Sequence, residues 1–385
     1  MNKEKMTVTM RLLTESYINK MISLPRHTFV LDLIHNTKPK LFFRGQSCSY
    51  GKSDLSASLY RNQKREETLI HEYTQRFSSQ FLTMRNNGER LAQMQHSGLN
   101  TRLLDVTSNA LVALYFAVED PQNKENGIVW TFETNVSGKK ENDRSKEELS
   151  NLQFLQFKYY DSDLLEVLST LCTLKESTKT ALWYDIKQFK ESQHIPDSPK
   201  MLQAYELYWQ SLSNGWGTAA GNDHIKKKLR KNMNLSKGEA RRLQKEYREL
   251  NESQAARDLY QKICNDVGAF DRNINFVDLE TPFVFGPPVS NERIRAQSGG
   301  FIFEPFFAAR SATEVGEKMQ MMLKNVSVSV TIRSCDKEPL REELDQLYAI
   351  NRETMFPDVF EGAQYVNGPD LENDPKSYNT LTQTK

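Results

Sequence analysis

The chain has 385 residues, with 51 Lys and Arg against 50 Asp and Glu, so its net charge of +1 indicates no class of partner. This length is enough for a full hydrophobic core, as one large domain with an insertion or as two domains. No apolar run approaches the ~20 residues that a membrane helix requires, and the first residues, MNKEKMTVTMRLLTESY, lack the apolar centre of a signal peptide. We therefore expect a cytoplasmic protein without a membrane partner. The cysteines are far apart and have no CxxC spacing, which argues against zinc and against a need for disulfides: Cys48, Cys172, Cys264 and Cys335.

The first strand that the sequence predicts ends in an arginine. Residues 11–35 have apolar positions at helical spacing and predict one or two helices, and the short apolar segment LFFRGQ, residues 41–46, follows. An arginine directly after three core residues is costly to bury unless it meets an anion or several acceptors. The alternative is that Arg44 reaches water at the strand end. Gly45 permits a backbone or a ligand to approach closely.

The segment from Gln95 to Ala117 is the centre of the predicted domain. A long amphipathic helix with an apolar stripe from Leu69 to Met84 precedes it, and a second helix covers Glu89–Gln95. A polar loop with His96 leads to several possible helix N-caps, from Asp105 to Asn109. The residues from Ala110 to Ala117 are all apolar, which predicts a helix buried on all sides. A structural ion pair between Arg102 and Asp105 is the alternative to a functional role for this loop.

The middle of the chain is predicted to be mostly helical. A hydrophilic linker covers 138–143, and Ser236 and Glu239 have capping-box spacing before a helix at Ala240–Val267. Interleaved glutamates make a solvated helix face one interpretation of the basic stretch here, and contact with a phosphate backbone is the other. The basic residues are Lys226, Lys227, Lys228, Arg230, Lys231, Arg241, Arg242, Lys245 and Arg248.

Strand patterns return in the last third. Phe276–Phe285 reads as a strand, the residues around Gly299 and Gly300 as a strand pair or a bulge, and Val326–Ile332 alternates as a half-buried strand. Arg293, Arg295 and Gln297 also alternate, so a strand would place their side chains on one face. A helix at Glu338–Ile350 and a short helix after Phe356-Pro357-Asp358 complete an α+β fold with a mixed sheet.

Scattered polar residues on predicted strands and turns are the candidates for chemistry. The chain has no GxGxxG, P-loop, GxSxG or HExxH motif. An arginine on a core strand suits a pyrophosphate or a carboxylate, whereas threonine, histidine and glutamine suit sugar hydroxyls and an amide. This set fits a dinucleotide better than a metal or an acyl group: Arg44, Gln46, His96, Thr101, Arg102, Asp105 and Gln297.

Several of these residues lie in motifs that resemble the FRG-domain family, named for its Phe/Tyr-Arg-Gly motif. The resemblance covers roughly 41–132 and 276–366, and it leaves out the helical middle. It is carried by Phe43-Arg44-Gly45-Gln46, Gln95-His96 with Gly98-Leu99, Thr101 to Asp105, Ala113 to Ala117, Arg293-Ile294 with Ala296-Gln297, and Asn351 to Asp358.

A looser resemblance connects the chain with ADP-ribosyltransferases. Phe43-Arg44-Gly45 is similar to their first-strand aromatic-Arg-Gly motif, and Thr101 to Ala117 to their Ser-Thr-Ser strand and following helix. In such enzymes the arginine holds the phosphates of NAD, and a late glutamate binds the nicotinamide ribose. This chain has Gln297 in the late motif, with Glu292 and Glu304 nearby.

The two resemblances together imply an ADP-ribosyltransferase-like core, 1–134 and 276–385, with a helical insertion at 135–275. The implied function is an NAD-dependent bacterial toxin or anti-phage effector that modifies RNA or a protein and has a neutralising antitoxin. The alternatives are a non-catalytic nucleotide or nucleic-acid sensor and a hydrolase of NAD or nucleic acid. The implied cofactor-binding residues are Arg44, Gly45, Gln46, Thr101 and Arg102, and the implied catalytic residues are Gln297, His96, Asp105 and Glu304. The RNA contacts would come from Lys226, Lys227, Lys228, Arg230, Arg241 and Arg242.

Overall fold

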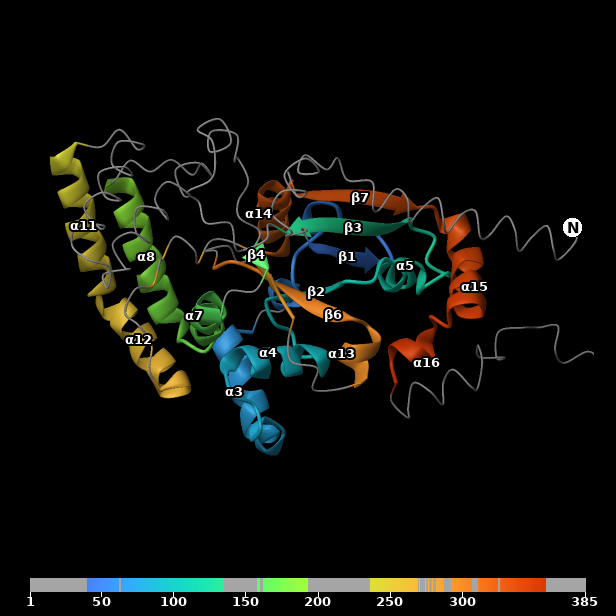
Figure 1. Ribbon diagram of the computed structural model, residues 1–385, viewed down its shortest axis with the longest axis horizontal. Helices are drawn as coiled ribbons and strands as arrows, with labels where there is room; N and C mark the ends of the chain where they lie inside the picture. The colour runs from blue at the N-terminus through green and yellow to red at the C-terminus, as the bar shows by residue number, and fades with distance from the viewer. Residues whose placement is uncertain are drawn as a thin grey trace, which may run out of the picture.

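The fold is built on one seven-stranded sheet with helices on both faces and at one end (Figure 1). The computed structural model describes residues 40–61, 64–134, 158–159, 162–192, 236–268, 270, 274, 276, 279, 282–286, 292–306, 311–324 and 326–357. The helices predicted at 11–35, the linker at 138–143, Lys226–Lys231 and the short helix after Asp358 lie outside the described residues. None of the described helices is both long enough and apolar enough to cross a membrane.

The strands are ordered β4-β5-β6-β2-β1-β3-β7. Only β4 and β5 pair in parallel, and the other neighbours are antiparallel, so the predicted mixed α+β fold is confirmed. The central strand β2 joins two distant parts of the chain, because it lies between β1 and β6. The strands are β1 (Lys40–Gln46), β2 (Leu103–Thr107), β3 (Gly127–Thr134), β4 (Lys158–Tyr159), β5 (Phe283–Phe285), β6 (Gly299–Phe303) and β7 (Ser327–Ile332).

Each face of the sheet has its own hydrophobic core. Helices α5 (Ala110–Val118) and α15 (Lys337–Tyr348) share a core with Phe43 and Val129 on one face. Helix α14 (Ala312–Leu323) packs over Phe42 and its neighbours on the other face. Helix α5 is almost wholly buried, as predicted, and Asn109 is its N-cap, with the side-chain oxygen accepting from the amide of Leu111 at 3.0 Å.

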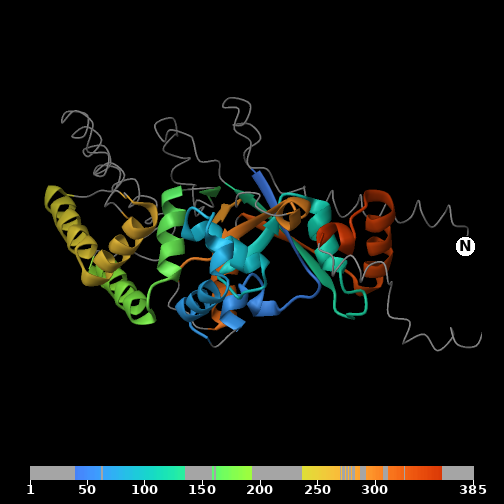
Figure 2. The ribbon, with the colours of Figure 1, turned by 90° about the horizontal axis from the view of Figure 1, so that it is seen from below.

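A layer of helices closes the β4–β5 end of the sheet, opposite α15 (Figure 2). Stacked phenylalanines of β5 and β6, among them Phe283 and Phe303 with ring centroids 5.7 Å apart, form the floor of this third core. The helices are α4 (Asn87–His96), α7 (Ser162–Cys172), α8 (Glu176–Ser192), α11 (Lys237–Asn251) and α12 (Gln254–Val267), with α3 (Glu66–Arg76) beside α4.

Two long predicted helices are each interrupted. The helix predicted through Met84 ends at Arg76 and continues as the 3₁₀ turn η3 (Ser78–Phe81). The predicted helix Ala240–Val267 is two helices, because the Ser253 side chain accepts from the amide of Ala256 and starts α12. The capping box of Ser236 and Glu239 at the start of α11 is confirmed.

The strand predicted through Arg293, Arg295 and Gln297 is wrong. Arg293 and Arg295 lie in the short helix α13 (Glu292–Ala296), and Gln297 lies in the turn that follows, where its amide donates to the Arg293 carbonyl at 3.0 Å. Strand β6 begins only at Gly299, after a turn in which Ser298 has φ of 46°. The remaining described elements are η1 (Gly51–Ser53), η2 (Ser58–Arg61), η6 (Ser334–Asp336) and α16 (Arg352–Met355).

Candidate functional site

An exposed carboxylate lies on the central strand of the sheet. Asp105 is exposed, although Leu103, Leu104, Val106 and Thr107 around it on β2 are buried. The sheet is covered by helices on both faces, so an exposed side chain in the middle of its fourth strand marks an interruption of that cover. A polar residue at such a position is not explained by packing, and this makes Asp105 the starting point for a site.

A chain of hydrogen bonds holds the Asp105 carboxylate. Its Oδ2 accepts from Gln95 Nε2 at 2.8 Å, and Gln95 Oε1 accepts from the Thr101 hydroxyl at 2.7 Å. The Thr101 hydroxyl in turn accepts from the amide of Leu103 at 3.1 Å. Because Thr101 is buried, this chain connects the exposed carboxylate to a fixed point at the start of β2.

Arg44 lies where β1 and β2 separate. These strands are in register at only one pair, Phe43 with Thr107, whereas β1 pairs with β3 along its whole length. Arg44 Nη1 donates to the Asp105 backbone carbonyl at 2.7 Å. Arg44 Nε is buried without a hydrogen-bond partner among the described residues. Burial lowers the pKa of the half-buried Arg44 guanidinium, and the Asp105 charge opposes this effect.

A second arginine, Arg61, lies near Arg44. Its guanidinium lies over the Tyr50 ring, 4.9 Å from the centroid, and its charge contributes to the lowered pKa of Arg44. The turn η2, which ends at Arg61, is held beside β2 because the amide of Leu59 donates to the Thr101 carbonyl at 3.1 Å. Arg61 was not chosen from the sequence, because it lies outside the motifs that carry the two resemblances.

His96 also lies near Asp105. Its ring packs against Phe301 with centroids 5.2 Å apart, and its carbonyl accepts from Arg293 Nη1 at 3.4 Å. Burial lowers the pKa of His96, with the Asp105 charge acting against that effect and the Arg293 charge adding to it. His96 is therefore neutral near pH 7, and its Nε2 is buried without a partner among the described residues.

Gly45 and Gln46 contact other parts of the protein. A Cβ on Gly45 would lie 1.8 Å from the Ala113 carbonyl oxygen, so the close approach that this glycine permits is that of α5. Gln46 is buried, and its Oε1 accepts from Trp130 Nε1 at 3.2 Å.

The family model of the FRG domain matches residues 39–126. This part of the chain is an FRG domain. The match begins just before β1 and ends just before β3, so Arg44, Gln95, His96, Thr101 and Asp105 all lie inside the FRG domain. The chain matches no curated protein and no solved structure. The described residues contain no group of three or more His, Cys, Asp or Glu that could hold a metal ion.

Two of the three late-motif candidates outside the FRG domain, Gln297 and Glu304, have buried side chains. Gln297 Nε2 donates to the Met355 carbonyl at 3.0 Å, and the Gln297 carbonyl accepts from the Thr107 hydroxyl at 2.7 Å. Glu304 is fully buried, and its Oε1 accepts from the amide of Ala57 at 2.6 Å. Burial raises the pKa of Glu304 to about 8, despite that hydrogen bond and the nearby arginines. Glu292 is exposed on α13, the helix that precedes Gln297.

Arg102 does not pair with Asp105. Its guanidinium forms a bidentate contact with Glu66, at 2.8 Å from Nε and 2.6 Å from Nη2, and both residues are buried. The predicted alternative, an ion pair between Arg102 and Asp105, is therefore wrong, because Asp105 is exposed and bonded to Gln95, whereas Arg102 is buried against Glu66. Glu66 was not chosen from the sequence as the partner of Arg102, because the two residues are far apart in the sequence.

Proposed function

We propose that the FRG domain of this chain binds NAD at Arg44 and Asp105 and transfers its ADP-ribose group to an acceptor. One observation carries the proposal: an exposed, hydrogen-bonded carboxylate on the central strand lies beside an arginine with an unpartnered buried Nε. A carboxylate and a phosphate-binding cation side by side suit a substrate that carries phosphates next to a centre that becomes positive.

The arginines supply the phosphate contacts in this proposal. Among the described residues, neither Arg44 nor Arg61 forms an ion pair with a carboxylate, and their charges oppose one another. A ligand with more than one negative charge relieves this repulsion. Guanidinium groups bind phosphate oxygens through charge-assisted hydrogen bonds, and two of them match a pyrophosphate.

Asp105 supplies the negative charge at the reacting carbon. When the bond between C1′ and the nicotinamide nitrogen breaks, its electron pair goes to the nicotinamide ring, and the ribose becomes an oxocarbenium-like cation. A fixed carboxylate stabilises that developing charge more than it stabilises the substrate. Gln95 fixes one oxygen of Asp105 for this purpose. We assign this role to Asp105 because Gln297 and Glu304 are buried and bonded to the backbone.

His96 is the proposed general base. The acceptor nucleophile attacks C1′ and loses a proton as the new bond forms, and a neutral imidazole is the form that accepts it. Burial and the charge of Arg293 lower the pKa of His96 against the opposing charge of Asp105, and the lowered pKa favours that form at neutral pH.

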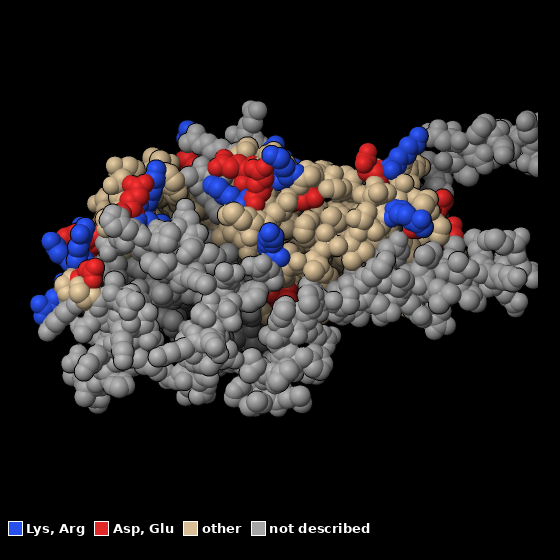
Figure 3. All heavy atoms as spheres, turned by 90° about the horizontal axis from the view of Figure 1, so that it is seen from above, with Lys and Arg blue, Asp and Glu red and all other residues tan. Residues whose placement is uncertain are grey.

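The acceptor is RNA or a protein side chain in this proposal, and the biological role is that of a toxin or anti-phage effector. On the described part of the basic stretch, Arg242 pairs with Glu246 and Lys245 with Glu249. Positive and negative side chains also alternate over the α8–α11 end in Figure 3. These pairs favour a solvated face for α11, whereas Lys226–Lys231 lies outside the described residues. A neutralising antitoxin would dock on the same helical layer.

One labelling experiment tests the activity. The purified chain is incubated with NAD labelled in its adenylate, together with RNA or cell lysate, and both free nicotinamide and labelled macromolecules are measured. We expect nicotinamide release with label on one class of acceptor. Release without labelled acceptor would indicate an NAD hydrolase, and NAD binding without release would indicate a sensor.

Asp105→Asn is the decisive variant in this assay. It keeps the hydrogen bond from Gln95 and removes the charge, so we expect at least a roughly 100-fold loss of turnover, the scale of a lost transition-state interaction. The control is Glu342→Gln, which removes an exposed carboxylate from α15, far from β2. Equal activity of the two variants would contradict the assignment.

A further inference from the structure

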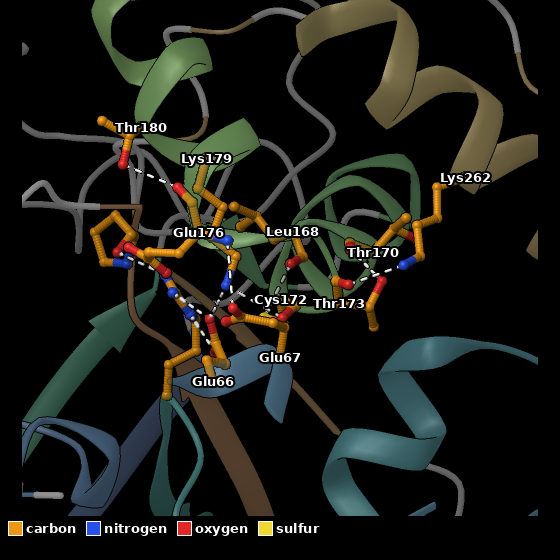
Figure 4. Close-up of polar contacts among 12 residues, drawn as sticks. Glu66, Glu67, Leu168, Thr170, Cys172, Thr173, Glu176, Lys179, Thr180 and Lys262 are labelled. Carbon is orange, nitrogen blue, oxygen red and sulfur yellow. Dashed lines mark hydrogen bonds and ion pairs between the residues drawn. The ribbon is translucent and has the colours of Figure 1, made fainter. Parts of the chain in front are cut away.

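A buried ion network connects the helical layer to the first residue before β2. Glu66 of α3 accepts from Arg102 and also from Lys179 Nζ of α8, at 2.8 Å, and all three side chains are buried. Figure 4 shows Lys179 reaching down from α8 towards Glu66. Lys179 Nζ donates further to the Cys172 carbonyl at the end of α7, at 3.2 Å.

Burial of these charged side chains is costly in free energy, which indicates that the fold requires them at these positions. A lysine is seldom fully buried, because removing an ammonium from water costs several kcal/mol. An apolar residue of similar size at 179 would pack α8 without that cost. Burial by itself raises the pKa of Glu66, but the two cations and their hydrogen bonds lower it to about 2, so the carboxylate stays charged and holds both partners.

The position that the network fixes is that of Arg102. Its side chain is held by Glu66, and its carbonyl accepts from the amide of Glu304 at 3.2 Å. The neighbouring Thr101 accepts from the amide of Leu59 and donates to Gln95, which holds Asp105. The chain of contacts therefore runs from α8, through Arg102 and Thr101, to the exposed carboxylate.

We propose that Lys179 and Glu66 are positioning residues for Asp105, and that helices α7 and α8, outside the matched FRG domain, are part of the working site. Without Lys179, Glu66 keeps Arg102 but loses its connection to α8, and the start of β2 loosens. The activity readout of this inference rests on the proposed function, whereas its exchange readout does not.

The test compares Lys179→Met with Lys262→Met in the full chain. Methionine keeps most of the apolar stem of lysine and leaves the Glu66–Arg102 pair intact, so the chain still folds. Lys262 is the control, an exposed lysine whose Nζ donates to the Thr173 carbonyl in the same helical layer at 2.8 Å without touching Glu66. Figure 4 shows both lysines around the end of α7.

The first readout is amide hydrogen exchange, which requires no ligand. In Lys179→Met we expect exchange at least roughly tenfold faster at Leu59, Leu103 and Glu304, whose amides bond Thr101 or Arg102. Amides between β3 and β7 should be unchanged, because local opening leaves distant pairs intact. Uniform acceleration, or none, would overturn the inference whatever the protein does with NAD.

The second readout is turnover. We expect Lys179→Met to lower kcat by roughly 10- to 100-fold, the effect of a small misplacement of a catalytic group, with KM for NAD within a few-fold. Combined with Gln95→Ala, its effect should be less than additive, because both changes release the same carboxylate. Wild-type kcat, or an additive combination, would overturn the inference while leaving the NAD proposal in place. Local exchange changes in a chain without NAD turnover would leave the inference in place and remove the NAD proposal.

Discussion

At the scale of single residues, Arg44 has a structural and a proposed functional contact at the same time. Arg44→Lys keeps a positive charge, but a single ammonium lacks the planar set of donors that reaches both the Asp105 carbonyl and a ligand. We expect both variants at this position, Arg44→Lys and Arg44→Ala, to lose at least roughly tenfold in affinity for NAD, measured by calorimetry. Their free energy of unfolding should fall by only about 1 kcal/mol, the usual value of one hydrogen bond. A large loss of stability with normal affinity would make Arg44 purely structural.

Glu304 predicts a pH dependence of stability. Its pKa is 4.5 when unfolded and about 8 when folded, so between these values the unfolded chain has released a proton that the folded chain retains. The stability contributed by Glu304 is complete below pH 4.5 and is lost as the pH rises through about 8. Glu304→Gln keeps an acceptor for the amide of Ala57 and cannot ionise.

We therefore expect Glu304→Gln to gain stability over the unchanged protein as the pH rises, by about 1.4 kcal/mol for each unit of pKa difference that is removed. Urea unfolding at about pH 5 and about pH 8.5 measures the gain. A difference between the two proteins that stays constant with pH would show that Glu304 ionises as freely in the folded state as in the unfolded one.

Several residues chosen from the sequence are brought close together by the structure, and their roles stay a prediction. Arg44, His96 and Asp105 were chosen from their motifs, and the structure brings them together around β2. Gln297 was chosen from the late motif, whereas the strand expected there came from the alternation of Arg293, Arg295 and Gln297. The structure has a short helix and a turn at Ser298 instead. Glu66 and Lys179 could not be assigned, because their contacts span 36 and 113 residues along the chain.

At the scale of elements, local patterns predicted those with enough apolar residues to show a run or a period. Helix α5 and strand β7 lie where their apolar patterns placed them. Periodicity did not identify strand β2, because Leu103 and Leu104 are too few to show a period, and only the resemblance to ADP-ribosyltransferases implied a strand there. Its pairing with β6, almost 200 residues later, decides its structure, as Leu103 with Phe303 shows.

The contact of α5 with β1 depends on Gly45. Because a Cβ there would lie 1.8 Å from the backbone of Ala113, Gly45→Ala must push α5 off the strand. We expect a loss of about 2 kcal/mol or more in the free energy of unfolding, typical of an overpacked core, measured by urea denaturation. The control is Gly238→Ala on exposed α11, where the nearest atom is 3.9 Å away and alanine favours the helix. Similar stability of the two variants would show that α5 shifts at no cost.

At the scale of the whole molecule, the FRG domain is smaller than the unit that folds. Strand β2 of the domain pairs with β6, and β1 pairs along its length with β3, so both partners lie beyond residue 126. Phe81 and Leu91 of the domain pack in the same core as Leu168 of α7 and Phe303 of β6. An isolated FRG domain would expose this core and leave strand edges unpaired.

We therefore expect residues 39–126 expressed alone to lack a cooperative thermal transition, whereas residues 40–357 unfold in one. Differential scanning calorimetry and near-ultraviolet circular dichroism of the two fragments measure this difference. The physical reason is that the excised domain keeps two central strands and loses the strands on both outer sides, together with α7, α14 and α15. A sharp transition in the short fragment would show that β1, β2 and their helices form a core of their own, and α7 and α8 would then be an addition to the site rather than part of it.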